Sequence, residues 1–297
     1  MAKPAAPWRI KGKKVYRNYS QEELDAQYDV AAPETPERAR ERSWAAESSA
    51  AARTTMTGRL GVAYGTGKDE KLDIFPASKP GAPVLFDIHG GYWKQFSAAD
   101  ESLYAPVYVG AGAAFVAMDY TLAPNATLDE IVRQCRAALA WTVAHAKDFN
   151  GDPARIHLLG RSAGGHLCGM MLATDWAAHG LRKNPIVGAT LISGLYDLEP
   201  IMLSFPNEWC RLDAQSAYRL SPIYHLPAEK MPAIVAWGGA ETDEFRRQSQ
   251  DIAVALQSRG WPTTVIEIPG AGHSGSRAEL VNRDSALCRA VMAQLGF

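Results

Sequence analysis

The chain has 297 residues, of which 47% are hydrophobic, and its formal net charge is −1. A chain of this length and composition can bury one large core, and its mixed charges give no electrostatic footprint for nucleic acid or for an anionic membrane. We therefore expect a compact protein whose partner is a small molecule rather than nucleic acid or a membrane.

Residues 1–58 are charged and rich in alanine, unlike the rest of the chain. Ser20 and Glu23 have the spacing of a capping box, and Thr35-Pro36 predicts the start of a longer helix through Trp44. We therefore expect an N-terminal helical extension. The first residues lack the apolar core of a signal peptide, and no apolar run reaches about 18 residues, so a cytoplasmic location is favoured.

From residue 59 onward, predicted strands and helices alternate. The predicted strands are short apolar, β-prone runs at residues 60–64, 71–75, 84–88, 113–118, 155–159, 186–192, 232–237 and 263–268. Helices are expected between most of the later strands, and Thr127 with Glu130 predicts the start of one of them. This alternation predicts an α/β catalytic domain over residues 59–297, with a mostly parallel eight-stranded sheet and ligands beyond the carboxyl ends of its strands.

A glycine-rich segment, His89-Gly-Gly-Tyr-Trp93, follows the third predicted strand directly. Unhindered backbone N–H groups in such a segment can stabilise the negative charge that develops on a carbonyl oxygen during acyl transfer. Gly90 and Gly91 are therefore candidate oxyanion donors. His89 is expected to shape the loop rather than to titrate, and an ordinary turn is the alternative interpretation of the segment.

The sequence Gly160-Arg-Ser-Ala-Gly164 follows the strand expected at 155–159. A serine on a tight strand-to-helix turn holds its hydroxyl clear of the backbone, where a base and a carbonyl carbon can both reach it. Residues 163–176 are rich in Ala, Leu and Met, as the expected helix requires. Ser162 is therefore the candidate nucleophile, and the N–H of Ala163 is the third candidate oxyanion donor.

His273 is the candidate base among the seven histidines. It stands late in the chain, in a glycine-rich segment after the strand expected at 263–268, from which its ring can swing toward Ser162. His166 lies one helical turn after Ser162 and is expected to pack or bond locally. The remaining histidines lie outside any such motif: His145, His157, His179 and His225.

The acid that orients the base is expected after the strand at 232–237. Glu241 is favoured because it is the first carboxylate of the following loop. Asp243 is the alternative, although Asp243 and Glu244 are typical of the first turn of a helix, where they complement its dipole.

These segments resemble the α/β-hydrolase superfamily, above all its hormone-sensitive-lipase-like branch. The resemblance rests on His89-Gly-Gly-Tyr-Trp93, Tyr120-Thr-Leu-Ala-Pro124, Asp152-Pro-Ala-Arg-Ile156 and Gly160-Arg-Ser-Ala-Gly-Gly-His166. Within that branch the chain is similar over nearly its whole length to the kynurenine formamidase (arylformamidase) family. That similarity includes Ala173-Thr-Asp-Trp176, Ser193-Gly-Leu-Tyr-Asp-Leu-Glu-Pro-Ile201 and Glu244-Phe-Arg-Arg-Gln-Ser249.

The resemblance implies hydrolysis of N-formyl-L-kynurenine to kynurenine and formate through an acyl-enzyme. In the family the acid lies three residues before the Glu-Phe pair, which selects Glu241. Two positions depart from the family pattern: Arg161 stands where His or Gln is usual, and Ser274 stands where a bulkier residue is common. Both positions are expected to touch the pocket.

Aromatic side chains are expected to line a site for the aryl leaving group, with core packing as the alternative interpretation. The candidates are Tyr92, Trp93, Phe96, Phe205 and Trp209. Residues 196–231 contain four prolines, break the strand–helix alternation and are expected to form a cap over the pocket. The extension over residues 1–58 is expected to pack beside the active-site mouth or against a partner subunit in a homodimer.

Two other functions stay open at this point. A carboxylesterase or amidase for another small aryl or short-acyl substrate would use the same three residues. A non-catalytic ligand-binding protein of this fold would usually have lost one of them. The four cysteines show neither Cys-x-x-Cys nor metal-ligand spacing, so we expect no disulfide, no metal and no cofactor.

Overall fold

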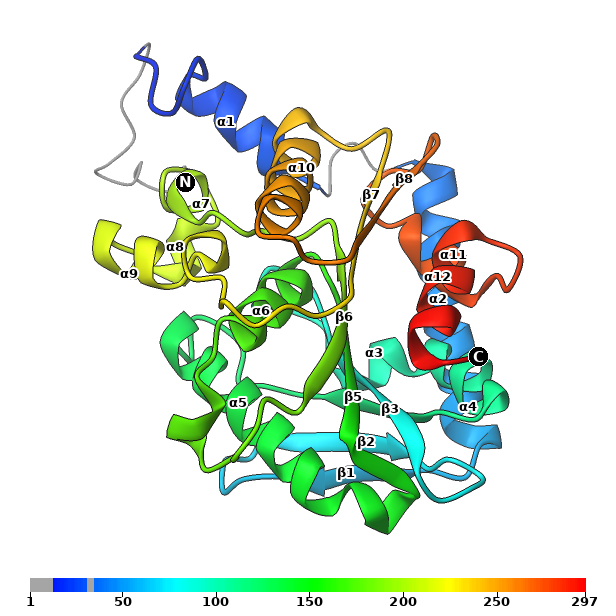
Figure 1. The fold of residues 1–297 in the computed structure, drawn as a ribbon. Coiled ribbons are helices and arrows are strands. Elements are labelled where there is room, and N and C mark those ends of the chain that lie inside the picture. The colour runs from blue at the N-terminus through cyan, green and yellow to red at the C-terminus, as the bar shows by residue number, and fades with distance from the viewer. Residues whose placement is uncertain (1–12, 31–34) are drawn as a thin grey trace.

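The computed structural model describes residues 13–30 and 35–297 (Figure 1). Residues 1–12 and 31–34 of the predicted extension lie outside the described residues. One eight-stranded sheet crosses the molecule in the order β1-β2-β4-β3-β5-β6-β7-β8. Its strands are β1 (Arg59–Ala63), β2 (Lys71–Phe75), β3 (Ala82–Ile88), β4 (Ala114–Met118), β5 (Gly151–Arg161), β6 (Ile186–Ile192), β7 (Ala233–Gly238) and β8 (Thr263–Ile268).

Strand β2 runs antiparallel to both of its neighbours, and the other adjacent pairs of this sheet are parallel. The predicted eight-stranded, mostly parallel sheet is therefore confirmed. Strand β3 is buried along its whole length. Val84 and Phe86 pack into the hydrophobic cluster on one face and Leu85 into the cluster on the other, because successive side chains of a strand point to opposite faces.

Helices cover both faces of the sheet. Figure 1 shows α5, α6 and α10 on one side and α2, α3, α4, α11 and α12 on the other. The helices of the described residues are α1 (Gln21–Tyr28), α2 (Pro36–Thr55), α3 (Ala98–Glu101), α4 (Ala105–Ala111), α5 (Leu128–His145), α6 (Ala163–Leu172), α7 (Glu199–Met202), α8 (Asn207–Cys210), α9 (Ala214–Arg219), α10 (Asp243–Ser258), α11 (Ser276–Val281) and α12 (Ala286–Leu295). Of these described helices, none combines the length and the apolar character that crossing a membrane requires.

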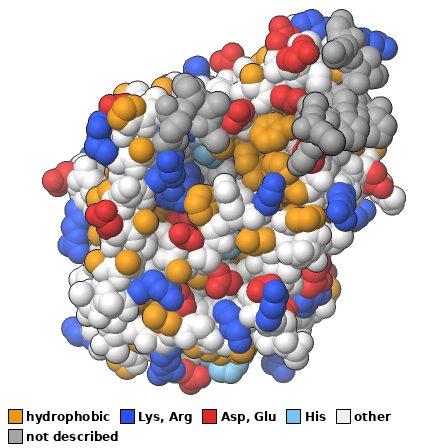
Figure 2. All heavy atoms as spheres, turned by 180° about the vertical axis from the view of Figure 1, so that it is seen from behind, with side chains coloured by type: hydrophobic (Ala, Val, Ile, Leu, Met, Phe, Trp, Pro, Cys, Tyr) orange, Lys and Arg blue, Asp and Glu red, His pale blue; other side chains and the backbone are white. Residues whose placement is uncertain are grey.

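Short 3₁₀ turns connect several of these elements, at Ser102–Tyr104, Ala146–Phe149, Trp176–His179 and Pro222–Tyr224. Residues 196–231 fold into α7, α8, α9 and the last of these turns. Figure 2 shows acidic and basic side chains interspersed over one face of the molecule, in keeping with the near-neutral net charge.

Two predicted helix ends are wrong. Helix α2 continues to Thr55 rather than ending near Trp44, because its alanine-rich second half buries Ala45, Ser49 and Ala52 along one side. Helix α6 ends at Leu172 rather than Trp176, because Asp175 accepts the N–H of Ala177 and begins a separate 3₁₀ turn. The predicted N-caps Ser20, Thr35 and Thr127 are confirmed.

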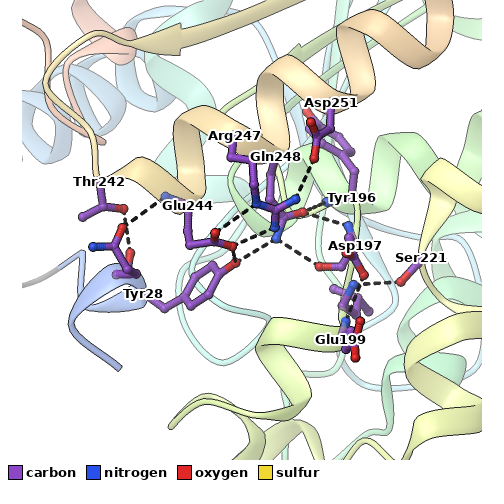
Figure 3. Close-up of polar contacts among 12 residues, drawn as sticks. Tyr28, Tyr196, Asp197, Glu199, Ser221, Thr242, Glu244, Arg247, Gln248 and Asp251 are labelled. Atoms are coloured by element: carbon purple, nitrogen blue, oxygen red, sulfur yellow. Dashed lines mark hydrogen bonds and ion pairs between the residues drawn. The ribbon is translucent and has the colours of Figure 1, made fainter. Parts of the chain in front are cut away.

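Helix α1 packs against α10 through a buried polar network (Figure 3). The hydroxyl of Tyr28 donates to Glu244 Oε2 at 2.9 Å and accepts from Gln248 Nε2 at 3.0 Å. Arg247 pairs with Glu244 at 2.7 Å and with Asp251 at 2.6 Å. Burial raises the pKa of Tyr28 well above its ordinary value, so its hydroxyl remains a donor to the buried carboxylate.

Replacing Tyr28 with phenylalanine is expected to lower the free energy of unfolding by about 1–2 kcal/mol, because Glu244 then loses a hydrogen-bond donor while it stays buried. Urea denaturation of the two proteins measures this difference. Tyr218→Phe is the matched control, since the Tyr218 side chain is 60% exposed. Equal unfolding free energies for Tyr28→Phe and the parent would contradict this role of Tyr28.

Candidate active site

Ser162 stands on a strained turn between β5 and α6. Its backbone has φ 58° and ψ −122°, which few non-glycine residues adopt, and its N–H donates to the carbonyl of Ile192 at 2.8 Å. A Cβ on Gly164 would overlap the carbonyl oxygen of Ile88, and one on Gly160 would lie 2.6 Å from Cys168 Sγ. The two glycines therefore allow α6 to approach the strands closely enough to present Ser162.

The three candidate residues for nucleophile, base and acid meet in one hydrogen-bonded chain. His273 Nε2 lies 2.9 Å from Ser162 Oγ, and His273 Nδ1 lies 3.1 Å from Glu241 Oε2. Ser162 follows β5, His273 follows β8 and Glu241 follows β7. All three therefore lie at the carboxyl edge of the sheet, where the sequence predicted a site. Such a chain lets a histidine take the proton of a serine hydroxyl while a carboxylate orients its ring.

Glu241 is held in place by three groups. Besides the His273 ring, Ser193 Oγ donates to Glu241 Oε1 at 2.5 Å and the backbone N–H of Gly238 donates to the same oxygen at 2.7 Å. Burial raises the pKa of Glu241, but attraction to His273 and these hydrogen bonds outweigh it, so the pKa lies below its ordinary value. The alternative acid, Asp243, is the first residue of α10, 76% exposed, and its carboxylate faces Arg246 at 3.8 Å instead.

The environment of His273 favours its neutral form. Burial lowers the pKa of the imidazole, attraction to Glu241 raises it, and the guanidinium groups of Arg161 and Arg277 lower it further, leaving it below its ordinary value. The ring also lies 4.3 Å from the ring of Phe245. A histidine that is neutral near neutral pH is suited to accept a proton.

The predicted oxyanion loop lies against the nucleophile turn. A Cβ on Gly90 would lie 2.7 Å from the carbonyl oxygen of Arg161 and 3.3 Å from Ser162 Cβ. Gly91 has φ +95°, and its carbonyl accepts the N–H of Lys94 at 3.0 Å, which closes a tight turn. Neither position has room for a side chain: at Gly90 the backbone lies against the nucleophile turn, and at Gly91 a Cβ would meet Gln95 and Phe96 of the same loop.

His89 and Ala163 are the neighbours of the oxyanion loop and of the nucleophile, respectively. His89 Nδ1 lies 2.8 Å from the carbonyl of Gly90, and its ring stacks on Tyr120 at 4.1 Å, so His89 shapes the loop as predicted. Ala163 is the first residue of α6, where the N–H groups have no intrahelical partner and the helix dipole is positive. The N–H of Ala163, directly after Ser162, therefore stays a candidate oxyanion donor.

The candidate pocket aromatics separate into two groups. Tyr92, Phe205 and Trp209 pack edge to face with centroid distances of 6.3, 6.1 and 5.7 Å, and the Trp209 indole donates to the Tyr92 carbonyl at 2.9 Å. Phe96 is 36% exposed, beside Arg277. Trp93, in contrast, is fully buried, so its predicted place in the pocket wall is wrong.

Trp93 lies in the core, where its indole N–H donates to His166 Nδ1 at 3.2 Å. His166 is also fully buried and bonds the carbonyl of Leu220 at 2.7 Å through Nε2. His166 thus packs in the core, as expected, but its side-chain hydrogen bonds join residues distant in the sequence, so the prediction of local bonds is wrong. Burial lowers the pKa of His166 to about 4, which leaves it neutral and structural.

A cleft of about 530 Å³ lies between the His273 loop and the N-terminal extension. His273 and Ser274 border it on one side, and Val30 and Glu37 on the other. The described part of the extension thus lies beside the site, as predicted. The lining of this cleft does not include the aromatic trio of Tyr92, Phe205 and Trp209, and whether residues 196–231 act as a cap stays a prediction.

Some residues of the site were not found from the sequence. Ser193, which supports Glu241, carries no motif of its own, although it begins one of the stretches shared with the formamidases. Within the described ranges 13–30 and 35–297, His, Cys, Asp and Glu side chains form no group of three that could hold a metal ion.

Comparison with known proteins decides the family. The sequence profile of the α/β-hydrolase fold family matches residues 85–276, which contain the oxyanion loop, Ser162, Glu241 and His273. The chain belongs to the α/β-hydrolase family. It is accordingly a hydrolase, and the fold predicted from the alternation of strands and helices is the fold of this family.

Individual relatives of this α/β hydrolase carry related names. The kynurenine formamidase of Salmo salar is 33% identical over 245 residues, which are 80% of this chain and 82% of the relative. The kynurenine formamidase of Danio rerio is also 33% identical, over 82% of this chain and 84% of the relative. A solved structure from Silicibacter sp. TM1040, described as a candidate thioesterase, is 29% identical, with a TM-score of 0.79 over 91% of this chain and 99% of its own.

Proposed function

We propose that this α/β hydrolase is a serine hydrolase that cleaves an aryl formamide, converting N-formyl-L-kynurenine to kynurenine and formate. The observation that carries the proposal is the hydrogen-bonded chain from Ser162 Oγ through His273 to Glu241. The 33% identity to kynurenine formamidases over most of both chains supports the choice of substrate.

The first half of the reaction forms a formyl-enzyme. Ser162 Oγ attacks the formyl carbon while His273 Nε2 takes its proton, and Glu241 stabilises the imidazolium. The N–H groups of Gly90, Gly91 and Ala163 stabilise the negative charge on the carbonyl oxygen.

His273 then returns its proton to the aniline nitrogen as the C–N bond breaks, and kynurenine leaves. In the second half, water attacks the formyl carbon of the ester on Ser162 while His273 accepts a proton from that water. Return of this proton to Ser162 Oγ releases formate and regenerates the free serine. The formyl group needs almost no acyl pocket, so most of the contact with substrate must be made to the aryl group. Phe96, which is 36% exposed, stays a predicted contact for it, and Tyr92, Phe205 and Trp209, which lie outside the cleft lining, would serve only if the aryl group reaches beyond this cleft.

The test is a side-by-side measurement of kcat/KM for N-formyl-L-kynurenine, 4-nitrophenyl acetate and 4-nitrophenyl butyrate. The proposal predicts a strong preference for the formamide. Good ester turnover with negligible formamide cleavage would overturn the proposed substrate and assign the protein as a carboxylesterase or amidase, because the same three residues serve both reactions.

Replacing Gly91 with alanine is expected to lower kcat about 10²- to 10³-fold while the protein stays folded. At φ +95° the new Cβ would meet the Gln95 carbonyl and the Phe96 ring, so the loop must move its N–H groups away from the oxyanion. Gly180→Ala is the matched control, because Gly180 has φ +81° but no atom within 4 Å of the added Cβ. Equal kcat for the Gly91 variant and the control would exclude this loop as the oxyanion site.

A further inference from the structure

Arg161 joins the segment of the nucleophile to the segment of the base. It is the last residue of β5, directly before Ser162, and its Nη1 donates to the backbone carbonyl of His273 at 2.9 Å. The side chain is almost fully buried, and its Nε has no hydrogen-bond partner in the described part of the chain. A buried guanidinium with an unpaired donor is costly, so structure alone does not explain its presence before the nucleophile.

Behind Arg161 lies a cluster of buried charged groups. Arg277 of α11 faces Glu101 of α3 at 3.4 Å, and both side chains are more than nine-tenths buried. Burial raises the pKa of Glu101, but attraction to Arg277 and Arg161 outweighs this, so the pKa lies below its ordinary value and Glu101 is ionised. Burial and the charge of Glu101 raise the pKa of Asp87 well above its ordinary value, which favours its neutral form. With the neutral form of Asp87 favoured, positive charge outweighs negative charge in the cluster.

This excess positive charge acts on His273. Arg161 and Arg277 oppose protonation of its ring, while Glu241, on the opposite nitrogen, favours protonation. The neighbouring His89 of the oxyanion loop adds no charge, because burial lowers its pKa. Burial, Glu241 and the two arginines together set the pKa of His273, and the arginines add to the effect of burial in moving to lower pH the point at which His273 is lost as a base.

We propose that Arg161 is a positioning residue that fixes the His273 loop to the end of β5 and, together with Arg277, places positive charge behind the His273 ring. This inference rests on the proposed role of His273 as general base. It goes beyond that role by naming the groups behind the loop that determine the acid limit of activity.

The test compares Arg161→Gln, which removes the charge, with Arg161→Lys, which keeps it. The acid limb of kcat/KM for 4-nitrophenyl acetate, measured between about pH 5 and pH 9, should move up by about one pH unit in Arg161→Gln. It should stay at the parent position in Arg161→Lys. Arg155→Gln is the matched control, since Arg155 lies on the same strand and bonds the carbonyls of Gly81 and Leu295, away from the site.

If Arg161→Gln and the parent have the same acid limb in kcat/KM, the inference is overturned. The reason is that loss of a purely structural arginine would change kcat without moving the acid limb. A second measurement uses the parent alone, so it does not depend on the folding of a variant. The imidazole pKa of His273, followed by NMR in ¹⁵N-labelled protein, must lie below the ordinary histidine value of about 6.5. A value above this would also overturn the inference.

Failure of the proposed serine mechanism gives a different result. In that case the parent hydrolyses neither the ester nor the formamide through Ser162, and no acid limb exists to be moved. Turnover of either substrate that depends on Ser162, with no shift in Arg161→Gln, removes the role of Arg161 and leaves the proposed roles of Ser162 and His273 in place. The ratio of formamide to ester turnover tests the proposed substrate separately.

Discussion

Ser162→Ala is expected to lower kcat/KM about 10⁴- to 10⁶-fold on any substrate the protein turns over, because the Oγ that His273 Nε2 contacts at 2.9 Å is the only atom removed. Steady-state kinetics measure the loss, and thermal unfolding checks that the variant is folded. Ser249→Ala is the matched control, since Ser249 is also a buried serine but its Oγ has no partner among the described residues.

The Ser162 experiment also separates catalysis from simple ligand binding. A Ser162→Ala variant that matches the parent in every assay would contradict the proposed mechanism and favour a non-catalytic binding protein of this fold. A loss of less than about tenfold would require a nucleophile other than Ser162.

Glu241→Gln is expected to lower kcat about 10³- to 10⁴-fold. The substitution keeps the shape of the side chain, but an amide neither stabilises the imidazolium nor fixes the tautomer that leaves Nε2 free to accept the serine proton. The pH dependence of the remaining activity should change as well. Loss of the negative charge beside His273 lowers the pKa of the ring, so the acid limb of the remaining activity moves to lower pH.

Asp243→Asn is the matched control for Glu241→Gln and tests the alternative acid directly. Asp243 is exposed at the start of α10, so its variant should keep the parent kcat within about twofold. A large loss in Asp243→Asn with a small loss in Glu241→Gln would reverse the assignment of the acid.

Much of the fold could be predicted because its signals are local. Each predicted strand is a short apolar run, and the eight runs correspond to the eight strands of the sheet. The three candidate catalytic residues could be placed at one edge of the sheet for the same reason. Ser162, Glu241 and His273 each follow a predicted strand, and the ends of parallel strands meet at one edge of a sheet.

The contacts that complete the site could not be predicted because they join distant residues. Ser193 supports Glu241 across 48 positions of sequence, and Arg161 bonds His273 across 112. Nothing in the immediate sequence around Arg161 indicates that its side chain points behind the His273 loop. Only the assembled sheet brings these groups together.

The aromatic pocket candidates illustrate a second limit of prediction from the sequence, the direction in which a side chain points. Tyr92 and Trp93 are adjacent and both aromatic, so the sequence treats them alike. Their backbones both have positive φ, 51° and 56°, in the turn that Gly91 begins, and this turn sends the Trp93 indole toward His166 in the core. The side to which each ring points depends on backbone angles that residue type does not specify.

The most direct test of the proposed function is titration with a fluorophosphonate, which forms a stable adduct with an activated serine. The proposal predicts one phosphonyl group per chain, located on Ser162 by peptide mass spectrometry. Turnover of N-formyl-L-kynurenine and of 4-nitrophenyl acetate should then fall together, in proportion to the labelled fraction. An adduct on another residue, or formamide turnover that persists in fully labelled protein, would contradict it.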